Sequence, residues 1–177
     1  TLRRTNYYYP SVNYVNQQEI LPTTLRFATQ ELALTAEMVE FHFAEISRLS
    51  KQIEQHETYD NKLNTLLAPL YWARAIEFAI VQDYTSAIDD CTRAALHAHK
   101  QLEPIIYFCR ANWRYRLLEY QRATGEQQAT NAMDFDIMLK DYDQVIKLLP
   151  DFSFAYYNKA NILCAQREWK DAIRYYT

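Results

Sequence analysis

The chain has 177 residues, of which 49% are hydrophobic and 23% charged, and its formal net charge is −3. This length suffices for one domain or a short repeat array, whereas the mixture of 19 basic and 22 acidic side chains argues against a nucleic-acid surface. No apolar run approaches the roughly 18 residues that a membrane span needs. The single glycine, Gly125, and only five prolines indicate helices joined by short turns, because β folds and phosphate-binding loops rely on glycine for positive φ.

The first 34 residues differ in character from the remainder. Pro10 and Pro22 interrupt any helix there, because the residue before a proline is pushed toward an extended conformation. Residues 12–19 predict two turns of helix, and residues 25–34 alternate partly, as in a short strand or hairpin. We therefore interpret residues 1–34 as an irregular, tyrosine-rich segment. No apolar stretch follows its first four residues, so any targeting segment would lie upstream, and both cytoplasm and cell envelope stay open as compartments.

Residues 35–59 predict a long amphipathic helix that packs on the rest of the chain. Thr35 is expected to cap its N-terminus, and Glu37 suits the positive end of the helix dipole. Apolar side chains recur at steps of three and four residues, which is the spacing of one helix face. The expected face consists of Val39, Phe43, Ile46, Leu49 and Ile53.

Residues 60–177 repeat a pattern. Three segments read tyrosine, aromatic, small or polar, basic, alanine: residues 71–75, 107–111 and 156–160. A second set reads acidic, aromatic, two spacers, small or flexible, aliphatic: residues 83–88, 134–139 and 168–173. Alanines 12 residues apart occur in two of the units: Ala75 with Ala87, and Ala160 with Ala172. Small residues at this spacing let antiparallel helices cross closely. A period of about 34 residues with two helices per unit indicates a helical solenoid, with an insertion near residues 114–131.

These repeats resemble the tetratricopeptide repeat (TPR) family over roughly residues 66–177. The last unit matches the family pattern best, at Tyr156, Ala160, Leu163, Trp169, Ala172 and Tyr176. The middle unit departs most, since Met138 stands where the family has alanine. The resemblance implies an all-α helical-hairpin solenoid of about three repeats. The last repeat would be truncated, so we expect the chain to be a fragment of a longer protein, bacterial in origin.

The resemblance also implies a concave groove, lined by the first helix of each unit, that binds a peptide or protein segment. Two of the matching positions, Ala79 and Cys164, only line the groove, and seven are expected to bind the partner: Trp72, Ile76, Phe108, Asn112, Tyr115, Tyr157 and Asn161. Asparagine side chains there could hydrogen-bond a ligand backbone, and aromatic rings would form apolar pockets. The alternative is that these side chains pack within the chain itself. A clamp for a terminal carboxylate is not expected, because Trp72, Phe108 and Tyr157 stand where family members with that clamp have lysine.

Other residues predict no catalytic, metal or cofactor site. His97 and His99 point to different faces of a helix and are interpreted as a surface pair. Two acidic pairs, Asp89 with Asp90 and Asp141 with Asp143, are interpreted as solvated helix faces. The repeated basic residues are expected to cover apolar surface with their stems while their charges stay in water: Arg74, Arg110 and Lys159. Free, buried thiols are expected for Cys91, Cys109 and Cys164.

The sequence thus predicts a non-catalytic scaffold that binds a protein or peptide partner. Two alternatives stay open. One is a glycan-binding component of a bacterial outer-membrane uptake system, in which exposed aromatic rings stack on sugars. The other is a structural spacer within a larger envelope protein. Partner identity and oligomeric state do not follow from the residues.

Overall fold

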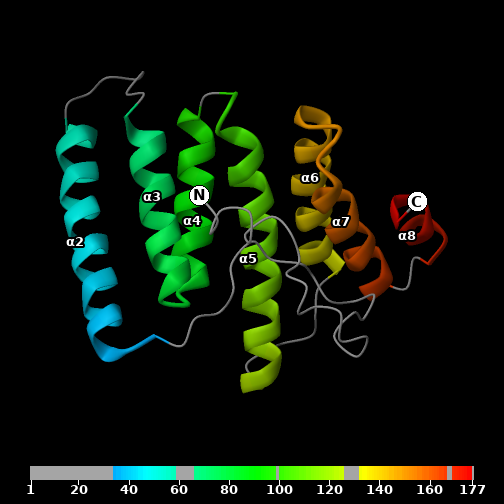
Figure 1. Ribbon diagram of the computed structural model, residues 1–177, viewed down its shortest axis with the longest axis horizontal. Coiled ribbons are helices and arrows are strands. Elements are labelled where there is room, and N and C mark those ends of the chain that lie inside the picture. Colours follow the sequence, from blue (N-terminus) through cyan, green and yellow to red (C-terminus); the bar gives the residue numbers. More distant parts are fainter. Residues whose placement is uncertain (1–33, 59–65, 99, 126–131, 167–168, 177) are drawn as a thin grey trace. The chain divides into compact units, whose positions relative to one another are not determined.

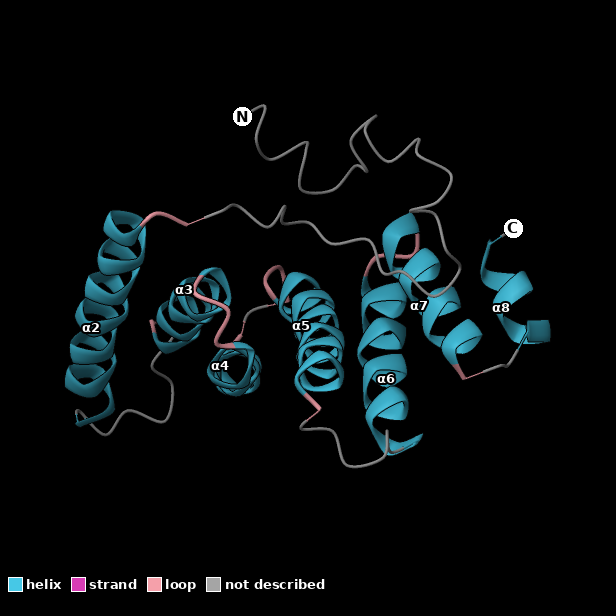
Figure 2. Cartoon of the chain, turned by 90° about the horizontal axis from the view of Figure 1, so that it is seen from below, coloured by secondary structure: helices cyan, strands magenta, loops and turns pink. Residues whose placement is uncertain are grey.

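The computed structural model describes residues 34–58, 66–98, 100–125, 132–166 and 169–176, and within these ranges the regular structure is entirely helical (Figures 1 and 2). The predicted all-α class is therefore confirmed. The helices form two groups, α2–α5 and α6–α8, which we describe separately. The predicted elements within residues 12–19 and 25–33 lie outside the described residues.

Helix α2 spans Ala36–Thr58, close to the predicted range of 35–59. The Thr35 hydroxyl accepts a hydrogen bond from the Met38 backbone N–H at 3.3 Å, as expected of an N-cap. The buried aliphatic residues of α2 are Ile46, Leu49 and Ile53. Phe43, which we had placed on this face, is 54% exposed. Half-buried His42 lies on the packed side instead, since its Nδ1 is 2.6 Å from Oε2 of Glu77 on α3.

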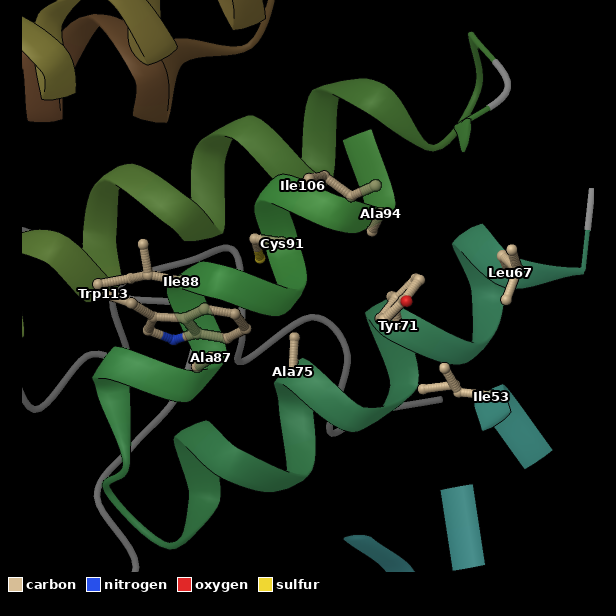
Figure 3. Packing of buried hydrophobic residues seen from close by; sticks show 10 residues of the cluster. All are labelled: Ile53, Leu67, Tyr71, Ala75, Ala87, Ile88, Cys91, Ala94, Ile106 and Trp113. Carbon is tan, nitrogen blue, oxygen red and sulfur yellow. The ribbon is translucent and has the colours of Figure 1, made fainter. Parts of the chain in front are cut away.

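Helices α3, Leu67–Ile80, and α4, Tyr84–His97, form a tight pair joined by a short turn. Ala75 and Ala87 are both fully buried, and their cluster also holds Tyr71 and Cys91 (Figure 3). Because alanine carries only a methyl group, it lets the two backbones approach while neighbouring rings fill the space. Asp83 begins α4 by accepting the Ser86 backbone N–H at 3.1 Å.

Helix α5, Glu103–Thr124, packs against α4. It has 22 residues where α3 has 14, which accounts for part of the extra length in the middle unit. Gly125 follows it with φ of 72°, a left-handed conformation that glycine adopts without steric cost and that commonly ends helices. Ile106 and Trp113 of α5 complete the cluster in Figure 3.

The second group contains α6, Ala132–Leu148; α7, Ser153–Ala165; and α8, Trp169–Tyr176. Helix α7 packs against both of its neighbours. Ala160 and Ala172 are buried, so the alanine positions of α3 and α4 are matched in α7 and α8. Pro150 lies two residues beyond the end of α6, in the turn to α7, consistent with the inability of proline to continue a helix.

Candidate functional site

The predicted groove residues are mostly covered. Four of the seven are buried: Phe108, Asn112, Tyr115 and Asn161. The other three are half-buried: Trp72, Ile76 and Tyr157. Only this second set keeps a substantial part of its surface available to a partner, so the candidate site is narrower than the predicted groove. It consists of two patches in different groups of helices, one on α3 and one on α7.

On α3, the candidate patch is Trp72 and Ile76, one helical turn apart. The Trp72 ring stacks on Trp113 of α5, with ring centroids 6.0 Å apart and planes at 21°. Both Trp72 and Ile76 also pack against the α3–α5 core. The side chains are thus held in place by the core while part of each remains exposed, which suits an anchor for a partner because little side-chain entropy is left to lose on binding.

On α7, the predicted positions are contacted by a single tyrosine of α8. The Tyr176 hydroxyl donates a hydrogen bond to Oδ1 of Asn161 and lies 3.7 Å from the Cys164 sulfur. The Tyr157 ring meets the Tyr176 ring edge-on, with centroids 5.6 Å apart. Burial raises the pKa of Tyr176, which favours the protonated phenol that donates the hydrogen bond to Asn161. Here the chain supplies its own contacts to Asn161 and Cys164, two positions of the predicted groove, whereas half-buried Tyr157 keeps part of its surface exposed.

The repeated basic residues connect neighbouring helices instead of pointing into water, so our prediction was wrong for the two that are well buried. Arg74 donates to both carboxylate oxygens of Asp90 on α4, at 2.6 and 2.8 Å, and to Ser50 on α2 at 3.0 Å. Lys159 donates to Asp143 on α6 at 2.5 Å and to Tyr175 on α8 at 2.7 Å. Although burial opposes its charge, the hydrogen bond to Asp143 helps to raise the pKa of Lys159.

The acidic pairs need the same correction. Asp90 and Asp141 are buried, whereas Asp89 and Asp143 are exposed. Only one member of each pair therefore lies on the solvent side of its helix. The bidentate hydrogen bonds from Arg74 explain how Asp90 is accommodated, since a buried carboxylate requires a charge partner.

The sequence analysis did not identify the residues that accept hydrogen bonds from the repeated basic side chains. Arg110 donates to Thr92 of α4 at 3.3 Å, just as Lys159 donates to Asp143 of α6. Thr92 and Asp143 each lie five residues after the small or flexible residue of their repeat, Ala87 and Met138. Aligning the second helices at that position would have revealed the pairing.

The described residues contain no group of three or more histidine, cysteine or acidic side chains that could hold a metal ion. The three cysteines are free. Burial raises the pKa of the Cys109 thiol to about 12, which makes it a poor nucleophile at neutral pH. None of the described helices is both long and apolar enough to cross a membrane.

No protein-family model matches the sequence, and the comparison with curated proteins finds no significant match.

Proposed function

We propose that this chain is a non-catalytic, TPR-type helical-hairpin scaffold that holds a protein or peptide segment. The observation that carries the proposal is the recurrence of one packing unit. Paired alanines are buried in both α3–α4 and α7–α8, and a basic residue of α3, α5 and α7 binds the helix that precedes it. Repetition of such units produces extended surfaces suited to binding other chains.

Two separate contact surfaces are proposed for the partner: half-buried Trp72 and Ile76 on α3, and half-buried Tyr157 on α7. Buried Asn112 and Asn161 serve the packing of the chain, so substituting them would test folding more than binding. Partly exposed aromatic side chains on a rigid support are the residue type that dominates binding at protein interfaces. Ile76 provides an adjoining apolar contact on α3.

A structural spacer is the second candidate, because four of the seven predicted groove residues are buried. In that case, the first helices of the units would use their side chains to hold the array together. The two candidates differ in what happens when a half-buried side chain is changed without unfolding the protein.

Capture of partners from a lysate of the source cells separates them. The baits are the wild-type chain, Ile76→Ser, Tyr157→Ser and the control Leu96→Ser, whose leucine is 78% exposed on α4. Circular dichroism first verifies that all four are equally helical. Capture of a protein by the wild type and the control, with loss in Ile76→Ser or Tyr157→Ser, supports the scaffold. Equal capture by all four baits, or none by any, favours the spacer.

A further inference from the structure

The repeated basic residues allow α2 to be compared with the second helices of the repeats. Each of these residues donates a hydrogen bond to the preceding helix: Arg74 to Ser50, Arg110 to Thr92, and Lys159 to Asp143. The position of α2 relative to α3 therefore corresponds to the position of α4 relative to α5, and to that of α6 relative to α7. Ser50, Thr92 and Asp143 mark equivalent positions of the three helices.

With this alignment, α4 and α6 share a buried face. In α4, it is made of Ala87, Asp90, Cys91 and Ala94, and in α6 of Met138, Asp141, Tyr142 and Val145; all eight residues are buried. In α4, Ala87, Cys91 and Ala94 of this face pack in the cluster with Tyr71 and Ala75 of α3 (Figure 3). Asp90 of the same face accepts the hydrogen bonds of Arg74. In α4, it is therefore the face with which the second helix of a unit docks on the first helix of that unit.

The equivalent positions of α2 carry a different set of side chains: Glu45, Arg48, Leu49 and Gln52. Leu49 is buried. The three others form a polar network along the helix, with Arg48 as the donor. Its Nε donates to both Glu45 oxygens at 3.2 and 3.1 Å, and its Nη1 donates to Gln52 at 3.0 Å. The hydrogen bonds from Arg48 lower the pKa of Glu45, which favours the charged form of this carboxylate.

We propose that α2 is the terminal cap of the array. It docks on α3 as a second helix would, and its outer face bears the Glu45–Arg48–Gln52 network in place of the docking face that α4 and α6 carry. Docking a first helix there would strip water from the Glu45 carboxylate and the Arg48 guanidinium, and this desolvation is unfavourable. Arrays of stacked repeats need a polar face at their ends to stay soluble, and this network supplies it.

The inference is independent of whether the array binds a partner, and thiol labelling in the intact chain tests it. Gln52→Cys and Arg48→Cys place a thiol on the proposed outer face, and Leu96→Cys provides an exposed reference. Native Cys91, which aligns with Leu49 and is fully buried, provides the protected one. Labelling is measured peptide by peptide, and each rate is divided by the rate at the same site in urea, so that differences in the intrinsic reactivity of the unfolded sites cancel.

A cap predicts normalised rates at positions 48 and 52 within about threefold of the exposed reference, with Cys91 slower by on the order of a hundredfold. Gln52→Cys leaves the Arg48–Glu45 ion pair intact, whereas Arg48→Cys removes it. Agreement between the two variants therefore shows that the labelling rate does not result from the loss of Arg48. Protection of both sites by about tenfold or more relative to Leu96→Cys would overturn the proposal, because another helix or chain would then cover this face.

Discussion

The Arg74–Asp90 pair offers the sharpest test of the packing in the α2–α5 group. Asp90 exposes 4% of its side chain and Arg74 exposes 14%, so neither charge is well hydrated. Truncation in Arg74→Ala leaves the Asp90 carboxylate buried without its two charge-assisted hydrogen bonds, and removing one partner of a buried pair costs about 3–5 kcal/mol. We expect this loss in the free energy of unfolding.

Urea unfolding followed by tryptophan fluorescence measures it. Trp72 and Trp113 both lie in the α2–α5 group, and Trp169→Phe as a background removes the signal of the tryptophan in α8. The matched control is Arg48→Ala, which breaks a solvent-exposed pair with Glu45 and should leave the urea midpoint nearly unchanged because such pairs contribute little.

A double variant separates the charge effect from simple loss of packing. Arg74→Met with Asp90→Leu removes both charges while retaining volume, and such replacements are often neutral or stabilising. We therefore expect it to recover most of the stability lost in Arg74→Ala. A loss below about 1 kcal/mol in Arg74→Ala would refute the reasoning, since a desolvated pair cannot be broken so cheaply.

Three further predictions concern single residues. Ala75→Leu should destabilise the α3–α4 pair by about 1–3 kcal/mol in urea unfolding, because Ala75 is fully buried at the helix crossing; an unchanged midpoint would contradict close packing there. At pH 9, alkylation of Cys109 in the folded chain should be roughly two to three orders of magnitude slower than in urea, since its pKa is raised from 9.0 to about 12. Because this pKa is higher in the folded state, the associated stability is complete below pH 9 and declines as the pH rises toward 12; alkylation at the unfolded rate would exclude the shift. Thr35→Ala should cost about 1 kcal/mol by removing the N-cap of α2, whereas Thr35→Ser should cost much less, and equal losses in both would argue against capping.

Local features of the fold could be predicted from the sequence because they depend on neighbouring residues. The cap at Thr35, the turn at Gly125 and the alanine pairs all follow from the conformational limits of a residue type or from its spacing along a helix. The helix of residues 35–59 follows from its apolar period in the same way. Which side of that helix packs against α3 did not follow from the period alone. Phe43 fits a step of four residues from Val39, but the packed side passes through His42, which finds Glu77 on α3.

Features that depend on the partner across a helix pair were missed. Asp90 is polar and was assigned to solvent, yet Arg74, 16 residues away on another helix, makes its burial possible. At Asn161, the groove prediction depends on a residue of another helix in the same way, because the Tyr176 hydroxyl of α8 donates to that amide within the chain. Such choices belong to tertiary packing, which a repeat pattern alone does not specify.

The most direct test of the proposed scaffold is photo-crosslinking in the source cells from position 72. A photoreactive phenylalanine derivative replaces Trp72, whose ring is half-buried on α3, and in a control chain it replaces Leu96 on α4. The account predicts discrete crosslinked proteins from position 72 that are absent or much weaker from position 96. No adduct at position 72, or the same adducts from both positions, would contradict a partner held by this array.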